Sequence, residues 1–349
     1  MNNYAMNTPK NTDESQVTGG DSQVGEGAVR AGVLGGGGYT GMEVLGLLAR
    51  HPRVEVAFAS SRSLAGTPSP VPGLPYSAPS MEACGEVDVV FLCLPHGVAA
   101  RWVTDLRDAF GDATPRLIDL TADHRPGSGN EKDAVYGMAE IASHRMPEAR
   151  LVANPGCYPT GVILSLLPLS EAGLIDSTRP LSIHASSGVT GAGRTPRQDL
   201  LFAEVADNYR AYGWGNRHRH LKEMRALLPG LPLIFQPHLL PVPRGILETM
   251  TVPVPPGTTA AQVRRCWEER YPSESSAVRV LPEGLPELRQ VIRTDLLILG
   301  AEDVADIDPP VVTVGAALDN LGKGAAGQAV QNMNAMLGWE LNEGIRWQH

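Results

Sequence analysis

The segment NPGCYPT at 154–160 places a single cysteine, Cys157, in a turn that comes just before an apolar stretch. Its glycine tolerates φ > 0 and its proline restricts φ, so the chain can bend sharply before the thiol. The apolar stretch 161–167 predicts a helix, with Thr160 as its N-cap. A helix N-terminus stabilises a thiolate, so the pattern predicts a lowered thiol pKa. A nucleophile and a packed core thiol both fit these residues.

Two histidines and an arginine lie together at His218, Arg219 and His220. A catalytic thiol needs a proton carrier whose pKa is near 7, and histidine is the usual choice. The same spacing could bind a metal ion, but no paired cysteines or acids accompany it, so we expect no metal site. A solvent-exposed basic turn is the alternative.

A run of glycines at 35–38 follows an apolar strand and opens a helical stretch, with Gly41 completing G-x-x-G-x-x-G spacing from Gly35. Such glycines let backbone N–H groups at a helix N-terminus approach a pyrophosphate, which predicts dinucleotide binding. A flexible linker is the alternative interpretation.

The end of the next strand, 54–59, indicates which dinucleotide is bound. NAD enzymes usually carry an acid there for the ribose 2′-hydroxyl, but the only acid here, Glu55, lies near the strand start. Ser60, Ser61 and Arg62 follow the strand and suit a 2′-phosphate, which favours NADP over NAD. The alternative is a solvated loop arginine.

Three further segments could hold an anionic or flat ligand. Arg125 follows an apolar strand, the segment 186–194 is a second glycine-rich loop, and the rigid segment PVPRG at 241–245 holds Arg244. Arginines placed in this way suit phosphate or carboxylate groups. An ordinary turn or a surface arginine explains each segment equally well.

The elements that must position these residues change in character along the chain. Before Cys157, strands at 29–34, 54–59, 87–94, 116–120 and 150–153 alternate with helices at 41–50 and 99–110, which predicts a doubly wound parallel sheet. After Cys157, strands are expected at 181–185, 249–254, 296–301 and 311–318, with proline-rich connections that include Pro237. A helix is expected at 260–270, where Thr259 and Gln262 have capping-box spacing. The last helix, 325–337, could return to the first sheet.

Composition limits the class of protein. The chain has 349 residues and a net charge of −9, which argues against nucleic acid and anionic membrane surfaces as partners. No apolar stretch approaches the ~20 residues of a membrane span. The four cysteines are far apart, which suits a reducing cytoplasm. Residues 1–28 are polar and without an apolar segment, which predicts a disordered tail.

Taken together, these segments resemble the N-acetyl-γ-glutamyl-phosphate reductase family, which is related to aspartate-semialdehyde dehydrogenase. The resemblance covers about 29–339 and rests on motifs in a fixed order: GGGGYTGMEVL (35–45), LPHG (94–97), DLTADHR (119–125), NPGCYPT (154–160), SSGVTGAGR (186–194), HRH (218–220), PVPRGIL (241–247) and DNLGKGAAGQAVQNMN (319–334).

The resemblance implies site residues. Cys157 matches the nucleophile, and His220, with His218 as its rival, matches the acid–base residue. Asn154, Arg125 and Arg244 are implied on the substrate side. The residues implied on the cofactor side are Gly35, Gly38, Tyr39, Thr40, Gly41, Ser60, Ser61, Arg62, Pro95, Ser187, Gly188 and Asn320. The chain departs from the family in its extra glycines at 35–38 and in Leu221-Lys222, where Thr-Pro is common.

The resemblance also implies an architecture and an activity. An NADP-binding Rossmann domain (29–156 and 319–349) is joined to an α+β catalytic and dimerisation domain (157–318) with a mixed, mostly antiparallel sheet. The implied reaction is NADPH-dependent reductive dephosphorylation of N-acetyl-γ-glutamyl phosphate, through a cysteine thioester, in a homodimer or homotetramer. Two alternatives stay open: a reductase of carrier-linked α-aminoadipyl or aspartyl phosphate, and a non-catalytic NADP-binding protein.

Overall fold

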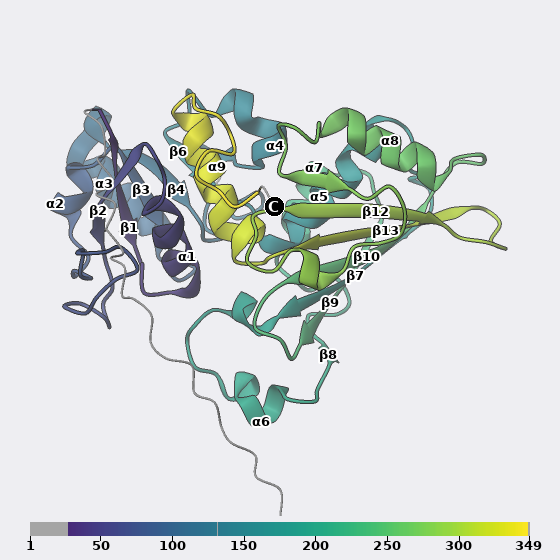
Figure 1. The fold of residues 1–349 in the computed structure, drawn as a ribbon, viewed down its shortest axis with the longest axis horizontal. Helices are drawn as coiled ribbons and strands as arrows, with labels where there is room; N and C mark the ends of the chain where they lie inside the picture. The colour runs from purple at the N-terminus through teal and green to yellow at the C-terminus, as the bar shows by residue number, and fades with distance from the viewer. Residues whose placement is uncertain (1–26, 131, 348–349) are drawn as a thin grey trace, which may run out of the picture.

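The computed structural model describes residues 27–130 and 132–347, so the predicted disordered tail lies almost entirely outside the described residues. The first half of the chain forms a six-stranded sheet that is parallel throughout, as predicted for a doubly wound fold (Figure 1). Its strand order is β2 (Val54–Ala59), β1 (Val29–Leu34), β3 (Val89–Leu92), β4 (Arg116–Asp119), β6 (Leu151–Ala153) and β5 (Val135–Tyr136).

Both faces of this first sheet are covered, which explains the continuous apolar run of β3. One face packs with α1 (Tyr39–Leu48) and α9 (Gly327–Met336), and the other with α2 (Met81–Gly85) and α3 (Ala99–Phe110). Helix α9 lies at the end of the chain, beside β6 in Figure 1. The predicted return of the last helix to the first sheet is therefore confirmed, and a π-helical turn, η6 (Gly322–Ala326), precedes that helix.

The second half of the chain forms a seven-stranded mixed sheet in which most pairs are antiparallel, as predicted. Its order is β11 (Val278–Val280), β12 (Leu297–Asp303), β13 (Val311–Leu318), β10 (Ile246–Pro253), β7 (Leu181–Gly188), β9 (Leu233–Leu240) and β8 (Arg210–Ala211). One face packs against α5 (Cys157–Glu171), α7 (Leu221–Leu227) and α8 (Ala260–Arg270). The opposite face leaves His184, Ile234 and Thr249 exposed. Short helices α4 (Ala139–Ala142) and α6 (Phe202–Val205) complete the described helices.

Two local predictions are wrong. Helix α5 begins at Cys157 rather than at 161, with Gly156 as its N-cap, and the Thr160 hydroxyl donates to the Gly156 carbonyl inside the first turn. Pro159 does not delay the helix, because first-turn N–H groups have no intrahelical acceptor anyway. Pro237, predicted to be in a connection, lies inside β9, which pairs fully with β7 but only at Leu239 and His238 with the short β8.

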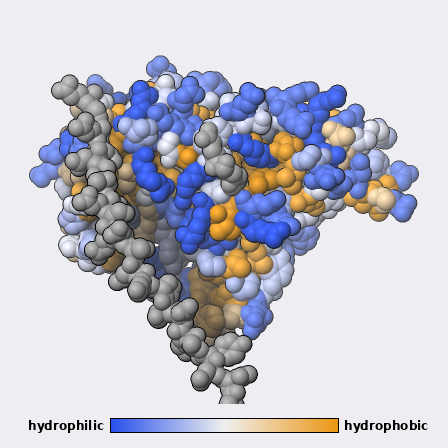
Figure 2. All heavy atoms as spheres, viewed as in Figure 1, coloured by the Kyte–Doolittle hydropathy of each residue, from blue (hydrophilic) through white to orange (hydrophobic). Residues whose placement is uncertain are grey.

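The hydrophilic character of the surface in Figure 2 agrees with the net charge of −9. On the face drawn in Figure 2, hydrophilic side chains cover most of the surface and apolar side chains form separate patches. No helix in the described ranges has the length and apolar character that crossing a membrane requires.

Candidate active site

Cys157 is the first residue of α5, where the carboxyl end of β6 leads through a tight turn into the helix. Its side chain is partly buried, and η6 covers it closely: a Cβ built on Gly324 would lie 2.9 Å from the Cβ of Cys157. Only glycine allows this approach of two backbones.

The predicted lowering of the thiol pKa is not found in the structure. Burial raises the pKa of Cys157 to about 11, although the positive charges of Arg125 and Arg219 and a hydrogen bond with the Tyr158 backbone oppose the rise. Loss of hydration therefore outweighs the helix terminus and the two arginines in setting the thiol pKa. The thiol is therefore neutral at pH 7 in the unliganded protein.

We expect alkylation of Cys157 by iodoacetamide to be slow at pH 7. Because the thiolate is the reacting form, the rate should rise about tenfold for each pH unit up to pH 9. Mass spectrometry of the Cys157 peptide measures the rate, with Cys157→Ser as the blank. A plateau between pH 6 and 8 would contradict this expectation, since it would reveal a preformed thiolate–imidazolium pair.

His220 is the histidine that lies against Gly156, the residue before the thiol. A Cβ built on Gly156, the residue before Cys157, would lie 2.9 Å from Nε2 of His220. The ring is buried, and its Nδ1 has no hydrogen-bond partner among the described residues. Burial, reinforced by the charges of His218, Arg125 and Arg219, lowers the pKa of His220 well below its usual value, so the ring is neutral.

His218 supports His220 rather than facing the same turn. Its Nδ1 accepts the backbone N–H of His220 at 3.2 Å, and the two rings meet edge to face at 4.7 Å. The ring of Tyr158 packs against both imidazoles. Burial lowers the pKa of His218 to about 4.

Arg125, predicted to bind an anion, is buried beside the same turn. Its Nε donates to the Asn154 carbonyl (2.8 Å), its Nη2 donates to the Leu120 carbonyl (3.0 Å), and its Nη1 lies 3.4 Å from Oε1 of Glu223. The Asn154 side chain does not face the thiol. It donates to the carbonyl of Ala325 and accepts from Nδ2 of Asn332, so its predicted contact with substrate has no geometric support.

Glu223 contacts several residues of this site, although no role was predicted for it. Its carboxylate accepts the backbone N–H of Gly156 (2.9 Å) and the hydroxyl of Tyr136 (2.9 Å), besides contacting Arg125. Only its place three residues after His220 could have indicated this role. The carboxylate holds the turn before Cys157 and the Arg125 guanidinium in fixed positions.

Two more basic side chains, Arg219 and His96, lie near Arg125 without having been predicted. The charge of Arg219 lowers the thiol pKa of Cys157, yet Arg219 is exposed and forms no ion pair with any described residue. His96, from the LPHG segment, accepts the backbone N–H of Ala122, and partial burial together with Arg219 and Arg125 lowers its pKa to about 4. The guanidinium groups of Arg125 and Arg219 therefore favour an anion near the thiol, whereas the neutral His96 adds no charge.

The glycine run forms a loop between β1 and α1 that fits a dinucleotide. Gly35 has φ +80°, and a Cβ built on Gly41 would lie 2.5 Å from the Gly35 carbonyl oxygen, so both positions require glycine. Gly38 is the N-cap of α1 and supplies no side-chain cap. The N–H groups of Tyr39, Thr40 and Gly41 at the start of α1 are therefore available to a pyrophosphate.

The residues predicted beside this loop lie next to it. The Ser60 carbonyl accepts the N–H of Gly36, and a Cβ built on Gly37 would lie 2.6 Å from Oγ of Ser61. Arg62 is exposed and pairs with no described acid, so its guanidinium is available to a 2′-phosphate. Pro95 is exposed just beyond the end of β3, the strand next to β1.

A second group of predicted residues lies at the ends of β7, β10 and β13. The Asn320 side chain donates to Oγ1 of Thr190 and accepts the N–H of Gly245, so it joins two loops. Ser187 and Gly188 are buried at the end of β7. A Cβ built on Gly188 would lie 2.7 Å from the backbone nitrogen of Arg244. Arg194 brings this group to the glycine loop by donating to the Gly37 carbonyl at 2.7 Å.

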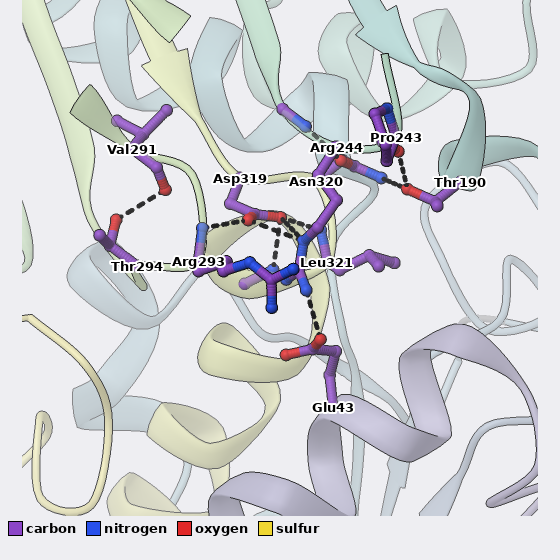
Figure 3. Close-up of polar contacts among 12 residues, drawn as sticks. Glu43, Thr190, Pro243, Arg244, Val291, Arg293, Thr294, Asp319, Asn320 and Leu321 are labelled. Carbon is purple, nitrogen blue, oxygen red and sulfur yellow. Dashed lines mark hydrogen bonds and ion pairs between the residues drawn. The ribbon is translucent and has the colours of Figure 1, made fainter. Parts of the chain in front are cut away.

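Arg244, predicted to meet a substrate carboxylate, is paired with two carboxylates of the protein, and only its Nη2 has no partner among the described residues. Figure 3 shows its guanidinium between Glu43 of α1 and Asp319, and its Nε lies 3.2 and 3.0 Å from the Asp319 oxygens. Arg346 pairs with the same Glu43. Arg244 is thus occupied by two carboxylates that lie far from it in sequence, and it joins α1 to the second sheet.

Within 27–130 and 132–347, no three His, Cys, Asp or Glu side chains converge as they would around a metal ion.

Cys93 packs against the core on the α1 side of the first sheet, and burial there raises the pKa of its thiol well above the usual value for cysteine.

Comparison with protein families divides the chain in the same way as the two sheets. Residues 30–149 match the family described as semialdehyde dehydrogenase, NAD binding domain, and 157–320 match semialdehyde dehydrogenase, dimerisation domain. The chain thus contains a dimerisation domain.

Curated relatives match over nearly the whole chain. The N-acetyl-gamma-glutamyl-phosphate reductase of Aromatoleum aromaticum is 41% identical over 346 residues, which cover 91% of this chain and 97% of the relative. The enzyme of the same name from Halorhodospira halophila is 39% identical, with 91% and 98% covered.

Solved structures share the fold at low identity. Aspartate semialdehyde dehydrogenase II of Vibrio cholerae has a TM-score of 0.72 at 18% identity, with 89% of this chain and 99% of that chain covered. The Candida albicans aspartate semialdehyde dehydrogenase, solved with NADP, has a TM-score of 0.64 at 20% identity, with 90% and 99% covered.

Proposed function

The chain belongs to the N-acetyl-γ-glutamyl-phosphate reductase family, and on that premise we propose that it reduces N-acetyl-γ-glutamyl phosphate to N-acetylglutamate 5-semialdehyde with NADPH, as a step of arginine biosynthesis. One observation carries the proposal beyond the family likeness. His220, Arg125 and Glu223 converge on Gly156, immediately before a thiol at a helix N-terminus. That set supplies a nucleophile, a proton carrier and an anion-binding group to one point.

Acyl transfer begins with Cys157. Its Sγ attacks the γ-carbonyl carbon, a C–S bond forms, and the bond from that carbon to the phosphate oxygen breaks. His220 is neutral and takes the thiol proton, which then passes to the departing phosphate. A phosphate beside Arg125 and Arg219 offsets the two charges that lower the pKa of His220, so the imidazole becomes a stronger base when substrate is bound.

Release of the aldehyde returns the enzyme to its starting state. When bound, NADPH supplies the hydride that reduces the thioester carbonyl. The C–S bond then breaks, its electron pair returns to Sγ, and the thiolate regains a proton from solvent through His220. In this proposal the N–H groups of Cys157 and Tyr158, at the start of α5, stabilise the negative charge of the carbonyl oxygen in both halves of the reaction.

The test is the reverse reaction of the purified chain. We expect N-acetylglutamate semialdehyde to reduce NADP only when phosphate is present, followed by NADPH absorbance. Aspartate semialdehyde and α-aminoadipate semialdehyde are the matched substrates. Faster turnover with either would reassign the substrate, and NADP binding without any turnover would indicate a non-catalytic protein.

Arg62 is expected to select NADP(H). Replacing Arg62 by alanine should raise KM for NADPH about 10- to 100-fold, since a charge-assisted contact with the 2′-phosphate is lost, and leave KM for NADH nearly unchanged. Arg50→Ala, which removes another exposed arginine of the same half, is the control. Equal losses with both cofactors would contradict this role.

Arg219, rather than Arg244, is expected to bind an anionic group of the substrate. Arg219→Ala should raise KM for substrate or phosphate about 10-fold or more, because its guanidinium pairs with no described acid. Arg244→Ala should instead lower the melting temperature, since Asp319 is left buried without its partner. Arg217→Ala, which removes another exposed arginine of the same segment, is the control. If only Arg244→Ala raised KM, the substrate-binding role would belong to Arg244 and not to Arg219.

We also propose the division into an NADP-binding domain at 29–156 and 319–349 and a catalytic domain at 157–318, in a cytoplasmic homodimer or homotetramer. The exposed face of the second sheet supports subunit contact, because His238 stacks there on both His184 and Tyr209 and no layer of helices from the described residues covers these rings. Light scattering of the purified chain distinguishes a dimer from a tetramer.

A further inference from the structure

A buried ion pair that the reaction does not use lies behind Cys157. Lys323, in η6, is fully buried and donates to Oε1 of Glu140 and to Oε1 of Gln331 (2.6 Å). Gln331 in turn donates to Glu140 (3.1 Å) and to Oδ1 of Asn342 (2.6 Å). Burial lowers the pKa of Lys323 and the Glu140 carboxylate opposes that shift, so the pair depends on both charges being present.

The pair connects two parts of the chain that are far apart in sequence. Glu140 belongs to α4, which follows β5 of the first sheet, whereas Lys323 lies in the π-helical turn η6 between β13 and α9. Two wide turns define that helix, with the N–H of Gly324 bonded to the carbonyl of Asp319 and that of Ala326 bonded to Leu321. Such π-helical turns are uncommon and frequently occur at functional sites.

The residue after Lys323 touches the nucleophile. A Cβ built on Gly324 would lie 2.9 Å from the Cβ and 3.3 Å from the Cα of Cys157. The next carbonyl, that of Ala325, accepts from Asn154 at 3.1 Å, and Asn154 supports Arg125 with its own carbonyl. The position of η6 therefore limits both the thiol and the turn before it.

We propose that Lys323 and Glu140 are positioning residues that hold η6 against Cys157 and so fix the direction of the thiol. The proposal rests on the catalytic role given to Cys157 above. Neither residue touches substrate, and their effect passes through Gly324.

The test separates positioning from stability. Lys323→Met alone leaves the Glu140 carboxylate buried without a partner and should lower the melting temperature. The double variant Lys323→Met/Glu140→Gln has no charge at either of the two positions and can keep an amide contact with Gln331, so its melting temperature should return toward that of the wild type. In this double variant we expect kcat to fall roughly 10- to 100-fold with KM for NADPH unchanged.

Alkylation of Cys157 by iodoacetamide at pH 9 needs no substrate, so it reports on the thiol even if the proposed reaction is wrong. Because η6 covers the thiol, loosening it should speed alkylation at least about threefold while turnover falls. If the double variant folds stably and its alkylation rate and kcat equal those of the wild type, the proposal is overturned.

Gly324→Ala tests the contact directly and carries the test if the double variant does not fold. The new Cβ must push η6 away from Cys157, so it should give the same combination of faster alkylation and lower kcat. Gly46→Ala is the control, since a Cβ there meets nothing within 4 Å. Unchanged alkylation and kcat in Gly324→Ala would also overturn the proposal.

Discussion

Replacing Cys157 by serine is expected to abolish turnover and to leave NADPH binding intact. In the proposed route every substrate molecule is attached to Sγ, and a serine hydroxyl is a far weaker nucleophile at neutral pH. Loss of a covalent nucleophile in other enzymes lowers kcat by about 10⁴- to 10⁶-fold, and we expect a loss of that size. The glycine loop and Arg62 do not contact Cys157, so the affinity for NADPH, measured by calorimetry, should stay unchanged.

Cys266→Ser is the matched control for this variant. Cys266 is a partly buried thiol on α8 that hydrogen-bonds the Pro168 carbonyl, well outside the site, and its replacement should preserve turnover. A thioester trapped on wild-type protein by acid quenching, and absent from Cys157→Ser, would support the covalent route. Substantial residual activity in Cys157→Ser would exclude it.

Replacing His220 by asparagine is expected to cost about 10²- to 10⁴-fold in kcat, the usual contribution of a general acid–base residue. His220 places Nε2 beside Gly156 and, with its lowered pKa, is neutral and able to accept a proton at pH 7. His218→Asn should cause a smaller loss, since His218 acts on His220 by a backbone hydrogen bond and ring packing.

The two histidine variants are controls for each other, because they remove the same group two residues apart. Both should retain NADPH affinity and a cooperative melting transition. A larger loss in His218→Asn than in His220→Asn would reverse the assignment of the acid–base residue.

The same lowered pKa should appear in the pH dependence of the wild-type enzyme. His220 and His218 stay neutral well below pH 6.5, so kcat/KM should not decline at pH 6 through protonation of a free-enzyme histidine.

Where local pattern was strong, the sequence was sufficient to predict elements. Helices α3 and α8 have the predicted bounds, the latter with the capping box of Thr259 and Gln262 present. The glycine loop lies between strand and helix as predicted. These features depend on periodicity and on side chains only a few residues apart, which the sequence contains in full.

Burial and long-range partners could not be predicted in this way. Arg244 has the local sequence of an available arginine, yet Glu43 and Asp319 occupy it. Glu223 joins Arg125, Tyr136 and Gly156 from three separate segments, and apart from its place after His220 the sequence does not indicate those contacts.

Cys157 has features that the sequence predicts and features that depend on the tertiary structure. Its residue type, its turn and its neighbours along the chain determined that a thiol stands at a helix N-terminus. Only the tertiary structure decided that η6 covers this thiol, that His220 lies against the residue before it, and that its pKa rises to about 11. The reason is that hydration and charge at the sulfur depend on groups brought together by folding from all along the chain, whereas the turn itself depends on adjacent residues.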